Sequence, residues 1–297
     1  MARTRSTGTT YPYLLVSPAV LVAVCIVLAP TVYTIALSLF EYILWKPQDF
    51  HFLWFQNYRA LFHDPVFAVS IVHTILWIVG VIVLQFLLGL ATALLLNRKF
   101  AWRGIARSLV LIPWVTPSVI TSLMWRWMYD GNSGVINELL VQVGIIHQFI
   151  PWLAGPTTAL PAIMVALMWQ GFPFFAIMIL AGLQTIRPEY YEAADVDGAR
   201  STRKFFTITL PLLSPVILTT LLLRTIWVAN SFDVIYIMTG GGPGYSTYTV
   251  PLYSYVAAYK SLNFGYASTL AVALTVVIGV IVAAYVIQIL KTEDTLT

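Results

Sequence analysis

Two groups of polar and aromatic residues interrupt apolar stretches of this sequence. They are Gln170, Gly171 and Phe174 within "MWQGFPFF", and Asn230, Ser231 and Asp233 within "VANSFDV". At helical spacing Gln170 and Phe174 are i and i+4, and Asn230 and Asp233 are i and i+3, so each pair shares a helix face. Amide and carboxylate groups on such faces could line a polar cavity. The alternative is that Gln170 and Asn230 only form hydrogen bonds to neighbouring helices.

The apolar run that contains "VANSFDV" also holds a basic residue, Arg224. Arg224 precedes Asp233 by nine positions, which places the two side chains on opposite sides of a straight helix and prevents a direct ion pair. Charged side chains within apolar spans are costly and mark functional sites by default. We expect Arg224 to reach toward another span.

The densest group of charges is a polar insert at residues 187–204. It contains four basic and four acidic residues: Arg187, Arg200, Arg203, Lys204, Glu189, Glu192, Asp195 and Asp197. Pro188 suits the first position of a helix, and the acidic residues suit its opening turns. The sequence therefore predicts a short helix, a turn at Gly198 and a second short helix ending at Pro211. An ordinary solvated hairpin between two spans would have the same composition.

The elements that must position these residues are membrane spans. The chain has 297 residues, of which 59% are hydrophobic and only 9% charged, and its mean hydropathy is +0.84. Soluble domains carry about a quarter charged residues. Long apolar runs, rather than short alternating ones, exclude an outer-membrane barrel and favour an all-α integral membrane protein. We place six runs of the length that a spanning helix needs at about 13–40, 68–96, 106–129, 160–186, 211–236 and 266–290.

The basic residues set the orientation of these spans. With a cytoplasmic N-terminus, eleven Lys and Arg residues lie on the inner side and four on the outer side, which obeys the positive-inside rule. Residues 1–12 and 291–297 are then cytoplasmic tails around a six-span domain at 13–290, with the insert facing the cytoplasm in the loop 187–211. The net charge of +4 is explained by this topology and by contact with anionic lipid, so it requires no nucleic acid partner.

Three further segments are interpreted conservatively. The first apolar run is too long for a cleaved signal peptide and indicates a signal anchor. Residues 134–155 are apolar but contain Glu138 and His147, so we expect an outer interfacial segment rather than a seventh span. The only cysteine, Cys25, lies in an apolar run and is expected to be a small core residue without a metal or disulfide role.

The insert and its flanks carry a family resemblance. Glu192-Ala193-Ala194, three residues, Gly198, nine residues and then Ile208-x-Leu210-Pro211 resembles the EAA signature of permease subunits in binding-protein-dependent ABC importers. "GLQTIRPEYYEAADVDGA" and "TGGGPGYSTYTVPLYSY" resemble the carbohydrate branch of that family, of the maltose, trehalose and glycerol-phosphate type. The resemblance covers about residues 10–290 and implies the six-span fold of a type I ABC importer permease in the bacterial inner membrane.

The resemblance implies a role for the insert. Its first helix, at about 189–198, would be a coupling helix that docks on a cytoplasmic ATPase subunit. Small alanines would permit close approach, Gly198 would permit the bend, and the acidic residues would contact the ATPase or cap the helix. The implied ATPase-coupling residues are Tyr190, Glu192, Ala193, Ala194, Asp197, Gly198 and Arg200.

The remaining implications concern partners and solute. The chain has no G-x-x-x-x-G-K-[ST] and no catalytic constellation, so we expect no enzymatic activity and no cofactor here, with ATP and Mg bound by two partner ATPase subunits. A second permease and an extracytoplasmic sugar-binding protein complete the implied importer. The solute would be a di- or oligosaccharide such as trehalose or maltose, contacted by Gln170, Gly171, Phe174, Asn230, Ser231 and Asp233. A related solute such as glycerol phosphate, its phosphodiesters or a polyamine remains an alternative, as does a stand-alone channel or membrane enzyme.

Overall fold

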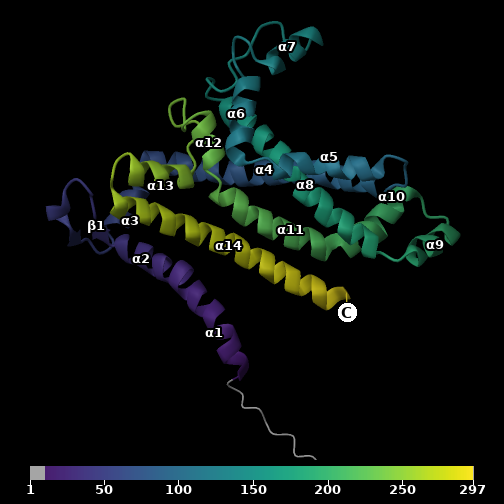
Figure 1. Ribbon diagram of the computed structural model, residues 1–297, viewed down its shortest axis with the longest axis horizontal. Helices are drawn as coiled ribbons and strands as arrows, with labels where there is room; N and C mark the ends of the chain where they lie inside the picture. Colours follow the sequence, from purple (N-terminus) through teal and green to yellow (C-terminus); the bar gives the residue numbers. More distant parts are fainter. Residues whose placement is uncertain (1–10, 297) are drawn as a thin grey trace, which may run out of the picture. The chain divides into compact units, whose positions relative to one another are not determined.

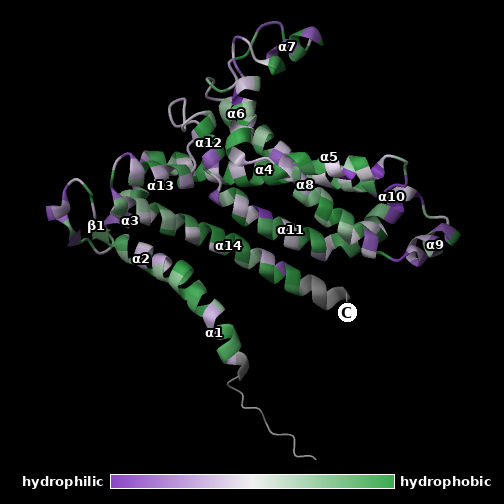
Figure 2. Cartoon of the chain, viewed as in Figure 1, coloured by the Kyte–Doolittle hydropathy of each residue, from purple (hydrophilic) through white to green (hydrophobic). Residues whose placement is uncertain are grey.

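Long apolar helices make up most of the computed structural model, which describes residues 11–296 (Figure 1). Within these residues, five helices are long and apolar enough to cross a membrane, and a bent pair of shorter helices makes a sixth span if it is counted as one. Figure 2 shows hydrophobic residues along the helices and hydrophilic ones gathered at their connections, as membrane spans require. The five helices are Tyr13–Leu37, Pro65–Asn97, Ala159–Thr185, Ser201–Asn230 and Phe264–Leu290.

The chain contacts divide the molecule into two compact units, which are described separately. The first comprises the described residues up to His63 together with Ser254–Ala273. Its first span consists of α1 (Tyr11–Ala23), a π-helical turn (Val24–Leu28) and α2 (Ala29–Leu37). Cys25 is exposed on this helix, so the prediction that it is a core residue was wrong.

A small hairpin follows the first span. Strands β1 (Phe40–Glu41) and β2 (His51–Phe52) pair antiparallel, with Phe40 opposite Phe52, around a 3₁₀ turn (Pro47–Asp49) and before α3 (Gln56–Phe62). The side chain of Asn57 donates to the carbonyls of Ser38 and Phe40 at 3.0 Å and holds the hairpin on α3. This hairpin is the exception to the predicted all-α fold.

The second unit, Asp64–Tyr253 with the residues from Leu274 onward, contains the central helices α4 (Pro65–Asn97) and α8 (Ala159–Thr185). The Asp64 carboxylate accepts from the Val66 amide at 2.8 Å and caps α4, with Pro65 at its first position. A Cβ at Gly89 would collide with Phe175 and with the backbone of α8, so a glycine is what lets the two helices touch. Helix α11 (Leu210–Asn230) packs on both.

The third predicted span is broken rather than continuous. Helix α5 (Arg103–Val115) and helix α6 (Ser118–Met128) meet at an angle of 93°. Thr116 precedes Pro117 and adopts an extended conformation with ψ of 124°, because the proline ring disfavours a helical conformation in the residue before it. The single run predicted at 106–129 was therefore two helices.

The fourth span is one continuous helix, and the fifth span ends earlier than predicted. Helix α8 continues through Pro173 in "MWQGFPFF", although a proline inside a helix often breaks it. Helix α11 ends at Asn230, and a separate α12 (Asp233–Met238) follows, so Asn230 and Asp233 do not share a face of one helix. The run predicted to reach residue 236 stops six residues earlier.

The remaining segments follow the predicted order. Residues 134–155 form a short helix α7 (Val135–Gln142) and a loop, and not a span. The last helices are α13 (Val250–Tyr259) and α14 (Phe264–Leu296), so the helix continues through most of the predicted C-terminal tail. Residues 1–10 of the predicted N-terminal tail lie outside the described residues.

Candidate functional site

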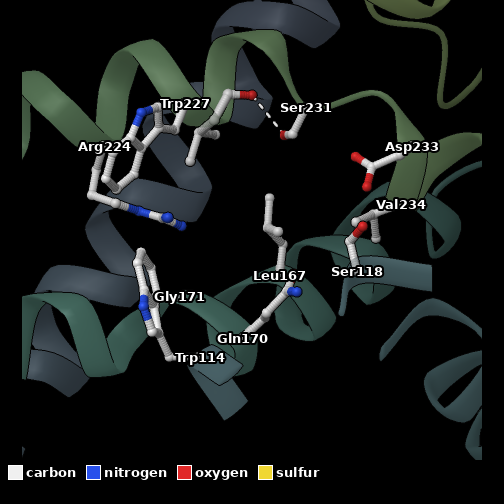
Figure 3. Close-up of a pocket in the computed structure, with 11 residues that line it drawn as sticks. Trp114, Ser118, Leu167, Gln170, Gly171, Arg224, Trp227, Ser231, Asp233 and Val234 are labelled. Atoms are coloured by element: carbon white, nitrogen blue, oxygen red, sulfur yellow. Dashed lines mark hydrogen bonds between the residues drawn. The ribbon is translucent and has the colours of Figure 1, made fainter. Parts of the chain in front are cut away.

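A cavity of about 310 Å³ lies where the two breaks face one side of α8 (Figure 3). Unwound backbone at membrane depth is tolerated where it lines such a cavity. One wall comes from the α5–α6 break, one from the middle of α8, and one from the end of α11 and the start of α12. The lining residues are Trp114, Ser118, Leu167, Gln170, Gly171, Arg224, Trp227, Val228, Ser231, Asp233 and Val234.

Side-chain hydrogen bonds fix both breaks. Gln170 donates from Nε2 to the carbonyl of Thr116 at 3.1 Å, which satisfies one of the carbonyls released at the α5–α6 break. At the end of α11, Trp77 from α4 donates from Nε1 to the carbonyl of Val228 at 3.1 Å and to Ser231 Oγ at 3.3 Å. Each opening is therefore held by a side chain from a neighbouring helix.

A buried arginine forms one end of the cavity. Arg224 is 7% exposed, and its Nε donates to Gln85 Oε1 at 3.0 Å. Gln85 in turn donates from Nε2 to the carbonyl of Leu167 at 2.7 Å, so this relay links α11, α4 and α8. As expected from the sequence, Arg224 reaches another span.

Aromatic rings surround the arginine. The rings of Trp114 and Phe174 are stacked at 5.1 Å, and Trp227 lies 5.9 Å from Trp114 and 5.1 Å from Phe174. The guanidinium carbon of Arg224 lies 5.4 Å from the ring of Trp114 and 5.8 Å from that of Trp227. This end of the cavity combines a cation with aromatic faces.

The structure brings together most of the residues proposed from the sequence. Gln170, Gly171, Ser231 and Asp233 line the cavity, and Phe174 supports it from behind Trp114. Asn230 does not line it: its side chain is exposed and donates to the carbonyl of Ile226 in the preceding turn of α11, at 2.8 Å.

Sequence reasoning did not propose several lining or supporting residues, including Trp114, Ser118, Trp227 and Gln85. Trp114 and Ser118 flank Pro117, and the two prolines at 113 and 117 were a signal that the chain opens there. Gln85 lies 139 residues from Arg224 in the sequence, and no local pattern points to their contact.

The polar insert contains two helical segments joined at Gly198, as predicted. Helix α9 (Pro188–Val196) is followed by Asp197 and then by Gly198, whose φ is +71°. The Gly198 amide donates to the Asp195 carbonyl at 3.0 Å, and the Ala199 amide to the Ala194 carbonyl at 2.9 Å. This pair of bonds is the Schellman arrangement, in which a glycine takes the left-handed position.

The second segment does not end at Pro211. Helix α10 (Ser201–Lys204) continues through a π-helical turn (Phe205–Thr209) into α11, and so the insert connects rigidly to the helix that carries Arg224. Figure 1 places α9 beyond the ends of α8 and α11.

The side chains of the insert fall into two groups. Lys204 pairs with Asp195 at 2.6 Å, and Tyr191 bonds Thr209 at 3.0 Å, which ties α9 to the second segment. Arg187 donates to the Tyr190 hydroxyl at 2.9 Å, and this bond, with the charges of Tyr190 and Glu189, raises the pKa of Arg187. The side chains exposed on this segment include Glu192, Ala193, Asp197 and Arg200, and Val196 is 88% exposed; Ala194 is half-buried.

No group of His, Cys, Asp and Glu residues that could hold a metal ion occurs within residues 11–296. His147, in the loop after α7, is exposed. The chemistry offered by the cavity is therefore hydrogen bonding, aromatic contact and charge.

Comparisons with known proteins agree on one family. Residues 85–292 match the family described as the binding-protein-dependent transport system inner membrane component. The chain is 38% identical to the sulfoquinovosyl glycerol transport system permease protein of Agrobacterium fabrum, over 95% of this chain and 90% of the relative. It is 35% identical to the trehalose/maltose transport system permease protein of Thermococcus litoralis, over 94% and 92%.

The fold is also that of a solved importer. A chain from the crystal structure of a bacterial ABC transporter involved in the import of the acidic polysaccharide alginate matches with a TM-score of 0.80 and 22% identity, covering 94% of this chain and 95% of that one. The six-span type I importer fold predicted from the sequence is confirmed by this match and by the family match. This protein therefore belongs to the family of inner-membrane permease components of binding-protein-dependent ABC transporters.

Proposed function

We propose that this chain is one of two permease subunits of an ATP-driven sugar importer, and that solute crosses the membrane through the cavity between the α5–α6 and α11–α12 breaks. The observation that carries the proposal is this cavity, where Gln170, Ser231 and Asp233 offer hydrogen-bonding groups beside Trp114 and Trp227. Sugars bind to such combinations because their hydroxyls need acceptors and donors while their C–H faces pack on aromatic rings. The descriptions of the two relatives reported above name sulfoquinovosyl glycerol and trehalose/maltose as what they transport.

The partners follow from the family. A second permease completes the path, an extracytoplasmic binding protein delivers the sugar, and two ATPase subunits bind ATP and Mg. In support, a solved importer of this fold was crystallised with its pentasaccharide-bound periplasmic protein. Lipid and the second permease would cover the exposed apolar side chains of the spans.

The polar insert is proposed as the contact with an ATPase subunit. Helix α9 carries exposed Glu192 and Ala193, and the Schellman turn at Gly198 fixes its direction. Because α10 continues into α11, a pull on α9 would move the helix that ends in the cavity. This geometry supports a direct mechanical route from ATP hydrolysis to the solute, with α9 and both termini in the cytoplasm.

The experiment is to purify the complete complex in lipid nanodiscs and measure ATP hydrolysis with solute-loaded binding protein. Disaccharides should stimulate hydrolysis severalfold, whereas amino acids and polyamines should not. Stimulation by a non-sugar solute alone would contradict the sugar assignment, and ATP-independent passage through the purified chain would contradict the importer assignment.

A further inference from the structure

The charge of Arg224 is not neutralised by any carboxylate among the described residues. Among the described side chains, the ion pairs of His51 with Glu41 and of Lys204 with Asp195 do not involve Arg224. Its one hydrogen bond to a protein acceptor uses Nε, so the terminal nitrogens of the guanidinium are left without an acceptor in this part of the chain. Figure 3 shows these nitrogens pointing into the cavity.

An uncompensated cation at this depth is costly. Moving a charged group out of water has a large free-energy cost unless a counter-charge or hydrogen bonds replace the water. The faces of Trp114 and Trp227 supply cation–π attraction, which is weaker than a paired anion. Asp233 lines the same cavity but lies beyond ion-pair distance from the guanidinium.

The surrounding residues hold the arginine in this position. The Gln85 amide is anchored on the carbonyl of Leu167 and fixes Arg224 through Nε, which leaves the terminal nitrogens directed toward the cavity. Gly171 makes room for this arrangement, since a Cβ at this position would collide with both Gln85 and the Arg224 terminal nitrogen. Three helices therefore fix the direction of the Arg224 guanidinium.

We propose that the transported sugar carries an anionic group, a carboxylate, sulfonate or phosphate, and that Arg224 binds it. This inference rests on the proposed sugar-import function and narrows its substrate class. The guanidinium donates two parallel hydrogen bonds to anionic oxygens, and the ligand's hydroxyls lie toward Ser118, Gln170 and Asp233. A polyamine does not fit this cavity, because its cationic groups would be repelled by Arg224 at a low dielectric constant.

The experiment compares sugars that differ only in charge. The complete complex of permeases and ATPases is placed in nanodiscs without the binding protein, so that the membrane cavity alone selects. Equilibrium binding is measured with radiolabelled glucose-, galactose- and mannose-based disaccharides, each beside its uronate counterpart with one hydroxymethyl group oxidised to carboxylate. The variants are Arg224→Gln, Arg224→Lys and, as a matched control, Arg126→Gln, whose exposed arginine lies outside the cavity.

The wild-type complex should bind one or more uronates about tenfold more tightly than the neutral counterpart. Arg224→Gln should abolish this preference, Arg224→Lys should keep part of it, and Arg126→Gln should change neither affinity. Retained basal ATP hydrolysis in each variant confirms that the complex is assembled.

Three results would overturn the inference. If the wild type binds a neutral sugar without preferring its uronate, sugar binding by the cavity stands and the anion site is wrong. If Arg224→Gln weakens both members of a pair equally, Arg224 only supports the helices. Failure of every sugar, neutral and acidic, to bind would remove the sugar assignment itself and this inference with it.

Discussion

Gly171 has a larger influence on the cavity than its size suggests. It is buried in the middle of α8, and the space beside it is occupied by the side chains of Gln85 and Arg224. Those two side chains come from α4 and α11, so one missing methyl group permits a contact among three helices. Gly279, in α14, has no neighbouring atom within 4 Å of an added Cβ and provides a comparison.

Gly171→Ala should therefore displace Arg224 or Gln85. Overpacking of this kind costs about 1–3 kcal/mol, so we expect a lower melting temperature of the purified complex and about tenfold weaker solute binding. Gly279→Ala should leave binding unchanged, because the added methyl group enters open space. Equal behaviour of the two variants would show that the contact at Gly171 is unimportant.

Gln170 and Asn230 are chemically similar amides in different positions. Gln170 lines the cavity, whereas Asn230 bonds its own helix. With one hydrogen bond to the solute lost at about 0.5–1.5 kcal/mol, Gln170→Ala should weaken solute affinity about two- to tenfold, and Asn230→Ala should not. Radiolabelled uptake at varied solute concentration separates the two. A larger effect of Asn230→Ala would contradict the assigned cavity.

At the scale of elements, the two helix breaks differ in how visible they are in the sequence. The α5–α6 break follows from Pro117, whose effect on the preceding residue is local. Residues 228–234 contain no proline or glycine. The α11–α12 break is instead held by hydrogen bonds from Trp77 in α4. Local sequence rules therefore locate the α5–α6 break. They do not locate the α11–α12 break and make the fifth span too long, because that break depends on a tertiary contact.

The turn after α9 is a local feature that the sequence does predict. Gly198 adopts φ of +71°, which costs most side chains about 1–2 kcal/mol but is tolerated by asparagine. A Cβ at this position meets no atom of this chain, so the cost is one of backbone conformation. Gly198→Val should redirect α9, reduce retention of the ATPase subunits and lower import at least severalfold, while Gly198→Asn should retain most activity.

The complete complex is reconstituted in vesicles with each Gly198 variant and with Glu192→Ala, and retention of the ATPase subunits and the import rate are measured. Loss of Glu192, an exposed carboxylate on the same helix, removes a charge-assisted contact worth about 1.5–3 kcal/mol if it reaches the ATPase. If the Gly198→Val variant and the Glu192→Ala variant each import at the wild-type rate, residues 187–211 do not transmit the motion.

At the scale of the whole molecule, the sequence predicts the number and order of spans but not their mutual contacts. Apolar length and the distribution of Lys and Arg are sums over many residues, so they survive errors at single positions. The relay from Arg224 through Gln85 to Leu167 joins positions 139 and 82 residues apart, and only the folded chain brings them together. Exposed Cys25 illustrates the same point, since an apolar run does not say which face is buried.

The orientation of the chain is tested by labelling. In a Cys25→Ser background, His147→Cys in the loop after α7 should react with a membrane-impermeant thiol reagent from outside, and Ser201→Cys only from inside. Both positions are exposed in the folded chain, so access depends on the side of the membrane alone. Reaction of Ser201→Cys from outside would reverse the orientation and remove α9 from the ATPase.

Passage of solute through the cavity that Ser231 lines requires this cavity to open to opposite sides of the membrane in turn, as ATP-driven closure of the ATPases pulls on α9. The most direct measurement is labelling of Ser231→Cys in the Cys25→Ser background, in vesicles carrying the complete complex, with an impermeant thiol reagent applied to either side. Without ATP the reagent should react from the cytoplasmic side, and with ATP trapped in a hydrolysis-deficient ATPase it should react from the outer side. Labelling that stays on one side in both states, or is blocked in both, would contradict the account.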